Sequence, residues 1–161
     1  MRTDPAPEWV LLLYRLPRDP STPRTAVWRR LRRLGVAQLS DGLVALPADP
    51  RSREALAWVA AQVREAAGTA ATWLARPTSR SQADELVEPL RAARAGEYAA
   101  VAASAREAAS LGDAERRRVL RRLRGELRAI RRRDWFAGDE QDDATRTVEA
   151  LAPATAQEVA R

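Results

Sequence analysis

The apolar stretch WVLLLYRLP, residues 9–17, decides which fold the rest of the chain can adopt. Its near-continuous apolar run is typical of a central β-strand that is buried on both faces. Pro17 ends the run, because proline has no N–H to give to a strand ladder. The next residues, RDPSTPR (18–24), predict a loop, since Pro20 and Pro23 interrupt regular structure.

A helix and a hairpin are predicted after this loop. Residues 25–35, TAVWRRLRRLG, carry apolar side chains at helical spacing and end at Gly35, which is expected to be the C-terminal cap. The apolar positions are Val27, Trp28, Leu31 and Leu34. Residues 36–47, VAQLSDGLVALP, predict two short strands joined at Ser40-Asp41-Gly42, because Asp-Gly supplies the positive φ of a tight turn.

A second helix and a last strand complete the pattern. Residues 52–67 begin with Ser52 as a cap and place apolar residues on one face, and residues 69–77, TAATWLARP, predict a strand. The element order is therefore βαββαβ. We expect a ferredoxin-like domain over residues 8–78, in which two helices cover one face of an antiparallel sheet.

Only helices are predicted after Pro77. Residues 81–112 form one helix, or two helices broken near Pro89, and residues 113–136 form the last strong helix, with Asp113 as its cap. The acidic stretch DEQDD (139–143) begins a last segment, for which the sequence allows one more helix with a frayed end. The predicted fold class is α+β, with an antiparallel helical segment over residues 79–161 packed on the sheet domain.

The composition excludes several kinds of catalytic chemistry. The chain has no Cys and no His, and all 28 of its positive side chains are Arg, so thiolate, imidazole and lysine Schiff-base chemistry are absent. No catalytic triad, metal cage, phosphate loop or dinucleotide fingerprint is present. DEQDD lacks the glycine and the ligand spacing of a calcium loop, so we expect a solvated segment. We predict a non-enzymatic protein with no catalytic residues, metal or cofactor.

Hydropathy and charge suggest where the protein works and what it meets. No apolar run approaches the ~20 residues that span a bilayer. The N-terminus, MRTDPAPE, is a poor signal peptide, so we expect a cytoplasmic protein with no membrane partner. The sequence pI of about 11.1 favours anionic partners, nucleic acid first.

One predicted helix carries the whole net charge. Residues 113–134 hold ten Arg and four acidic residues, a net of +6, while the rest of the chain has 18 of each. Five of these Arg fall within a wedge about 80° wide at ~100° per residue: Arg117, Arg121, Arg124, Arg128 and Arg132. They are candidate phosphate contacts. The alternatives are a solvated face, an acidic partner protein, or internal neutralisation by Glu97, Glu107 or DEQDD.

A second basic group follows the first strand. Its candidate nucleic-acid contacts are Arg18, Arg24, Arg29, Arg30 and Arg33, with Arg15 and Arg32 nearby. A ferredoxin-like sheet brings the first helix near the loop after the first strand, so we expect Arg18 and Arg24 to join the helix residues in one patch. The competing interpretation is a solvated helix face.

The tryptophans are predicted to be mainly structural. Trp9, Trp28, Trp58 and Trp73 are assigned to the core, because each lies in a strand or on an apolar helix face. Trp135-Phe136 follows the Arg-rich helix directly. That pair either docks the helix onto the sheet or presents a stacking or dimer surface.

Several of these stretches together resemble the amino-terminal domain of the ChrB family of chromate-resistance regulatory proteins. The likeness is carried by residues 9–47, by EYAAV (97–101) and by IRRRDWF (130–136). It implies a DNA-binding transcriptional regulator, which we expect to be a homodimer, with chromate or another oxyanion as an effector. The usual architecture of that family adds a carboxy-terminal domain, which we do not expect in this chain.

A more distant resemblance is to PaaX-type repressors and to small CRISPR-associated ferredoxin-like proteins. The CRISPR-associated group ends its first strand in Tyr-Asp, whose Asp is the proposed metal ligand. This chain has Tyr14-Arg15 instead, and a guanidinium there would repel Mg²⁺. A phosphodiesterase-like remnant is therefore the third and weakest interpretation.

Overall fold

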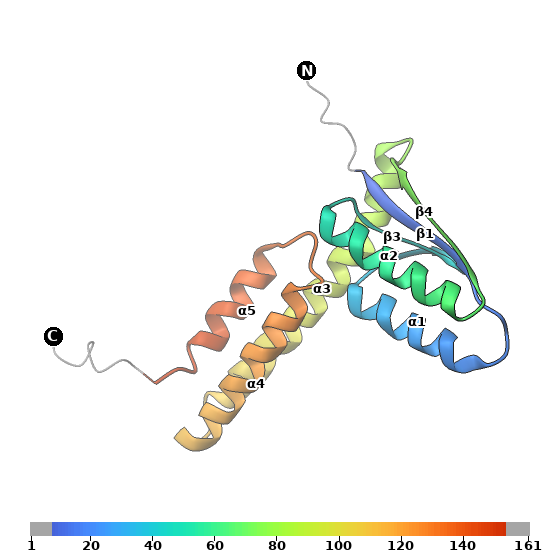
Figure 1. Cartoon of the computed structure of the whole chain (residues 1–161). Helices are drawn as coiled ribbons and strands as arrows, with labels where there is room; N and C mark the ends of the chain where they lie inside the picture. The colour runs from blue at the N-terminus through green and yellow to red at the C-terminus, as the bar shows by residue number, and fades with distance from the viewer. Residues whose placement is uncertain (1–7, 154–161) are drawn as a thin grey trace. The chain divides into compact units, whose positions relative to one another are not determined.

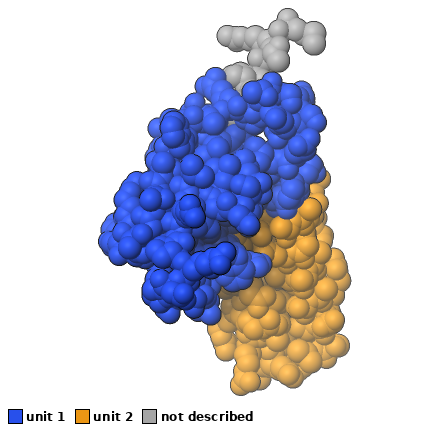
Figure 2. All heavy atoms as spheres, turned by 90° about the vertical axis from the view of Figure 1, so that its right-hand side faces the viewer, with its two compact units in different colours: residues 1–90 blue, residues 91–161 orange. Residues whose placement is uncertain are grey.

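The computed structural model describes residues 8–153 and divides into two compact units, residues 1–90 and 91–161 (Figures 1 and 2). The first unit holds the sheet and the second is helical. The division falls inside helix α3 (Arg80–Ala108). The sequence places its boundary at 78/79 instead, where the chain changes from strand to helix, and that boundary stays a prediction.

The first unit has the predicted βαββαβ order and confirms the α+β class. Its four strands form one sheet in the order β2-β3-β1-β4, and every neighbouring pair is antiparallel. This is the split βαβ arrangement. The strands are β1 (Trp9–Arg15), β2 (Ala37–Ser40), β3 (Leu43–Pro47) and β4 (Thr69–Ala75), and the helices are α1 (Ser21–Leu34) and α2 (Pro50–Glu65).

Strand β1 lies between β3 and β4, and α1 and α2 cover one face of the sheet (Figure 1). Leu12 and Val10 of β1 are buried, as are Val27 of α1 and Leu56 of α2. The prediction that β1 is buried on both faces is wrong at its C-terminal end, where Leu13 is 50% exposed. Leu13 lies on the opposite face from Leu12, because side chains alternate along a strand.

The helix starts differ from those predicted. α1 begins at Ser21 and includes Pro23, so the predicted loop over 18–24 is too long. Proline is tolerated in the first helical turn, where its missing N–H has no intrahelical partner to bond. α2 begins before Ser52, because Asp49 is the cap: its carboxylate accepts a hydrogen bond of 2.6 Å from the Ser52 N–H.

Three of the four tryptophans assigned to the core are exposed. Trp9 is buried, but Trp28, Trp58 and Trp73 are 49%, 61% and 61% exposed. Trp58 lies about 200° around α2 from the buried Leu56 at ~100° per residue, so it faces solvent. Trp28 is stacked under Arg32, whose guanidinium carbon is 5.0 Å from the ring centre.

The second unit packs the C-terminal part of α3 with α4 (Asp113–Arg131) and α5 (Asp139–Glu149). α3 continues through Pro89 as one helix. The predicted apolar stripe of α4 is buried: Leu120, Leu123, Leu127 and Ile130. Gly112, and not Asp113, occupies the N-cap position of α4. DEQDD forms the start of α5, the further helix that the sequence allowed. The frayed end predicted after it includes residues 154–161, which lie outside the described residues.

A polar contact joins α3 and α5 to the segment that follows α4. The hydroxyl of Tyr98, buried on α3, donates a hydrogen bond of 3.0 Å to Oδ2 of Asp134 and lies 3.2 Å from Oε1 of Gln141 on α5. Beside it, Glu97 forms an ion pair of 2.9 Å with Arg133 and one of 3.0 Å with Arg94. Burial, followed by the Asp134 hydrogen bond, raises the pKa of Tyr98. Within residues 8–153, no helix is long and apolar enough to cross a bilayer.

Gly42 provides a test of the hairpin. Its φ is +77°, and a Cβ there would collide with the Tyr14 carbonyl oxygen. Gly42→Ala is expected to lower the free energy of unfolding by more than ~1 kcal/mol in urea denaturation. Gly96→Ala is the matched control: it lies in α3 with open space around it, so it should raise stability by ~0.5–1 kcal/mol. Equal effects from the two changes would contradict this account.

Tyr98→Phe tests the polar contact. Losing a buried hydrogen bond to a carboxylate should lower the free energy of unfolding by about 1.5 kcal/mol or more. Because the folded pKa of Tyr98 is raised above the ordinary tyrosine value of about 10, its contribution to stability is present below pH 10 and is lost as pH rises further. The wild type should therefore lose more stability above pH 10 than Tyr98→Phe does. Tyr14→Phe is the control for the hydrogen bond at neutral pH, because the described residues give the Tyr14 hydroxyl no hydrogen-bond partner. Burial and the nearby charge of Asp41 raise the pKa of Tyr14 as well, so the comparison above pH 10 is made between the wild type and Tyr98→Phe alone.

Candidate nucleic-acid interface

The outer face of α4 is the strongest candidate surface. Burial of the apolar stripe turns the opposite side of the helix towards solvent, and Arg117, Arg121 and Arg128 are all exposed there. Within residues 8–153, no carboxylate forms an ion pair with any of these three. At 1.5 Å per residue, the row from Arg117 to Arg128 is about 16 Å long.

Two members of the predicted wedge differ from these three. Nε of Arg124 donates a hydrogen bond of 2.9 Å to Oε1 of Glu149 on α5, and Nη2 contacts Oε2 of the same carboxylate. The Arg124 hydrogen bond lowers the pKa of Glu149, so this carboxylate stays charged at neutral pH. Arg132 lies just beyond α4, at its C-cap, and makes contacts of its own.

The other acids near α4 bind Arg residues outside the wedge. Asp113 pairs with Arg116 at 2.6 Å, and Glu126 pairs with Arg122 at 2.7 Å. The residues predicted as internal neutralisers act elsewhere: Glu97 binds Arg94 and Arg133, and Asp143 of DEQDD binds Arg106 and Arg146. Glu149, which the sequence did not single out, neutralises Arg124, while Arg117, Arg121 and Arg128 have no carboxylate partner within residues 8–153.

The first unit gathers a second group of guanidinium groups. Arg15, Arg18 and Arg24 line a hollow of about 490 Å³ with Pro17 and Gly68. Nη2 of Arg24 donates a hydrogen bond of 2.9 Å to the carbonyl oxygen of Pro17, which holds the first turn of α1 against the loop after β1. The structure thus brings Arg18 and Arg24 together at this hollow. That they form one patch with Arg29, Arg30 and Arg33 stays a prediction.

Helix α1 presents the remaining predicted residues. Arg29 and Arg33 are exposed and four residues apart, so they share a face, while Arg30 is half-buried. The exposed Trp28–Arg32 stack next to them was not predicted. The sequence signal for it is that an aromatic residue and an arginine lie four residues apart on one helix, which places them on the same face. The nucleic-acid role of these positions, like that of the α4 wedge, stays a prediction.

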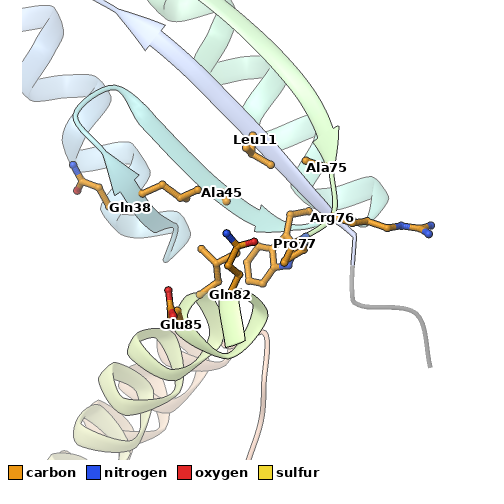
Figure 3. A pocket seen from close by; sticks show the side chains of 11 residues that line it. Leu11, Gln38, Ala45, Ala75, Arg76, Pro77, Gln82 and Glu85 are labelled. Carbon is orange, nitrogen blue, oxygen red and sulfur yellow. The ribbon is translucent and has the colours of Figure 1, made fainter. Parts of the chain in front are cut away.

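A third location is a hollow of about 450 Å³ between the sheet and the first turns of α3 (Figure 3). Leu11, Ala45 and Ala75 line its sheet side, and Gln82 and Glu85 lie on the helix. In the part of the chain that the structure describes, no group of three or more acids gathers to hold a metal ion. Its polar side chains are one carboxylate, two amides and one guanidinium (Glu85, Gln38, Gln82 and Arg76) among apolar groups, which is not a recognisable catalytic set.

Comparison with known proteins identifies the family. Residues 24–160 match the family model described as "Protein ChrB, N-terminal". The chain is 32% identical over 141 residues to Protein ChrB of Cupriavidus metallidurans, which covers 85% of this chain and 43% of that protein. The chain thus spans less than half the length of this curated relative, and no solved structure matches it. With most of its length matched to the family model, the chain belongs to the ChrB N-terminal family.

Proposed function

We propose that this chain is a non-enzymatic regulatory protein that binds DNA through Arg-lined helix faces and acts in chromate resistance. The observation that carries the DNA part is the α4 row of Arg117, Arg121 and Arg128, which is exposed and has no carboxylate partner among residues 8–153. The chromate part rests on family membership. An oxyanion effector is part of the proposal on the same ground of family membership. This chain spans 43% of its relative.

The α4 row suits a phosphate backbone on physical grounds. Neighbouring like charges on an isolated helix cost ~0.2–0.5 kcal/mol per pair, and a polyanion removes that repulsion. Arg forks bind two phosphate oxygens at once. The helix is held by its buried stripe and by the Tyr98–Asp134 contact, so the row needs little ordering on binding. Such contacts position a protein on DNA without reading its sequence.

The α1 surface supplies a second set of contacts. Arg29 and Arg33 are exposed beside the Trp28–Arg32 stack, and Arg18 and Arg24 line the adjoining loop. Exposed guanidinium and indole groups suit phosphates and unstacked bases. We assign this surface a supporting role, because its charges are more scattered than those of α4.

The Arg124–Glu149 pair favours one rival function. It shows that this face of α4 accepts a carboxylate, so an acidic partner protein could bind the same row with no nucleic-acid role. The two functions differ in their dependence on DNA phosphates. The variants below separate them, because loss of the row should abolish DNA binding only if DNA is the ligand.

The double variant Arg121→Glu/Arg128→Glu tests the α4 row. In mobility shifts on a 30-base-pair duplex over a salt series, its affinity should fall by at least ~100-fold, because two phosphate contacts are replaced by repulsion. The slope of log affinity against log salt should shrink by ~2, at about one per lost contact.

The matched control is Arg106→Glu/Arg146→Glu, which makes the same charge change in the same unit. Both of these Arg already pair with Asp143, so a much smaller loss is expected. Equal losses of DNA affinity in the two double variants would mean that the effect comes from net charge and not from the α4 row. Unchanged binding by Arg121→Glu/Arg128→Glu would remove α4 from the interface and favour the acidic-partner function.

Glu149→Gln tests the neutralised part of the wedge from the opposite direction. Releasing Arg124 adds one guanidinium to the row, so DNA should bind more tightly and the salt slope should steepen by ~0.9. Glu126→Gln is the control, because its partner Arg122 lies outside the wedge. The measurement is the same salt series. A gain for Glu126→Gln as large as that for Glu149→Gln would contradict the proposed geometry.

A further inference from the structure

Strand β4 forms an edge of the sheet, next to β1 (Figure 1). Its sequence, TAATWLA, contains no charged residue and no proline over Thr69–Ala75. Thr72, Trp73 and Leu74 are all exposed, with Trp73 at 61%. An edge strand of this kind is a template for pairing with another strand, because one row of its backbone groups has no neighbour.

The register shows which backbone groups point outward. The Tyr14 N–H donates to the Gly42 carbonyl on the β3 side of β1, so the alternate residues Leu11 and Leu13 must bond to β4. Trp73 lies opposite Leu11 and therefore bonds to β1. By alternation, the N–H and C=O groups of Ala70, Thr72 and Leu74 point away from the sheet.

A side-chain contact supports this assignment. Nη2 of Arg64 donates a hydrogen bond of 2.8 Å to the Ala70 carbonyl, which therefore lies on the outer side of β4. For Thr72 and Leu74, the outward backbone groups have no hydrogen-bond partner anywhere within residues 8–153. The centre of the edge is thus open, while its start is capped by Arg64.

Strand β2, at the opposite edge of the sheet, is better protected against pairing with another strand. Strand β2 has four residues, and its pairing with β3 shifts between Gln38 and Ser40. Short length and an irregular register both discourage edge pairing. β4 has seven residues paired in continuous register with β1 and shows neither device.

We propose that two copies of this chain associate through β4, antiparallel to each other, across a two-fold axis at Trp73. In this register Thr72 of one copy pairs with Leu74 of the other, and the reverse, so all the open backbone groups are used. The two Trp73 residues then face each other at the non-hydrogen-bonded position, where Cα atoms are only about 4.5 Å apart. Cross-strand aromatic pairs at this position stabilise a sheet.

A second copy fits this edge better than a foreign strand. The open groups lie symmetrically around one residue, which is what a two-fold pair of identical strands requires. The formal net charge of +6 opposes association of two copies elsewhere, but Thr69–Ala75 carries no charge to repel. The resulting dimer would carry two related sets of Arg faces, which suits a palindromic DNA site.

Trp73→Lys tests the interface without DNA, so its outcome is independent of the proposed DNA binding. Sedimentation over a concentration series should give twice the 17.8 kDa chain mass for the wild type. Trp73→Lys should raise the dimer dissociation constant by at least ~100-fold, because like charges would lie opposite each other. Trp58→Lys is the matched control: Trp58 is equally exposed, at 61%, but lies on α2, and the dimer should persist.

Cysteine cross-linking provides a second readout that needs no loss of association. The chain has no Cys, so Trp73→Cys introduces a single thiol that would face its copy at a distance suited to a disulfide. Mild oxidation should give a covalent dimer with Trp73→Cys and little with Trp58→Cys. A monomeric wild type, a dimer that Trp73→Lys leaves intact, or equal cross-linking at both positions would overturn the proposal.

Discussion

The buried hydrogen bond from Tyr98 to Asp134, with the Glu97–Arg133 ion pair beside it, is the constraint on which the candidate interface depends. A polar group buried without a partner costs free energy, so Tyr98 fixes the end of α4 at one place on α3. The apolar stripe of α4 then sets the rotation of the helix. Together they leave one orientation, in which Arg117, Arg121 and Arg128 face solvent.

Some arginines of the second unit form ion pairs within it, and others are exposed without a carboxylate partner among residues 8–153. The acids beside α4 bind Arg residues at its flanks and ends, where ion pairs join helices or brace one turn. Glu149 reaches the wedge from α5 and pairs with Arg124. Exposed pairs of this kind contribute little to stability. The row of Arg117, Arg121 and Arg128 therefore adds no ion pair to the packing of the unit, and the proposed function uses it as a binding surface.

Local patterns predicted most of the fold, and the misses have two causes: non-local pairing and the misjudged position of one residue on its helix. The alternation and helical spacing of apolar residues, with the Asp-Gly turn, were enough for the βαββαβ order. Trp73 was misassigned because strand order, which non-local pairing decides, makes β4 an edge. Trp58 was misassigned because residue type was weighed above its position on the helix. The Arg124–Glu149 pair joins residues 25 apart in sequence, which no local pattern reveals.

In the second unit, the family likeness and the exposed row of Arg117, Arg121 and Arg128 rest on different residues. EYAAV and IRRRDWF contribute Glu97, Tyr98, Arg133 and Asp134, and these meet in the structure as one internal contact. They hold the scaffold together. The exposed Arg row lies outside both stretches. It occupies a face of α4 that the packing of the unit leaves exposed. Membership of the ChrB N-terminal family therefore accounts for the placement of α4, while the case for DNA depends on the charges that this chain puts there.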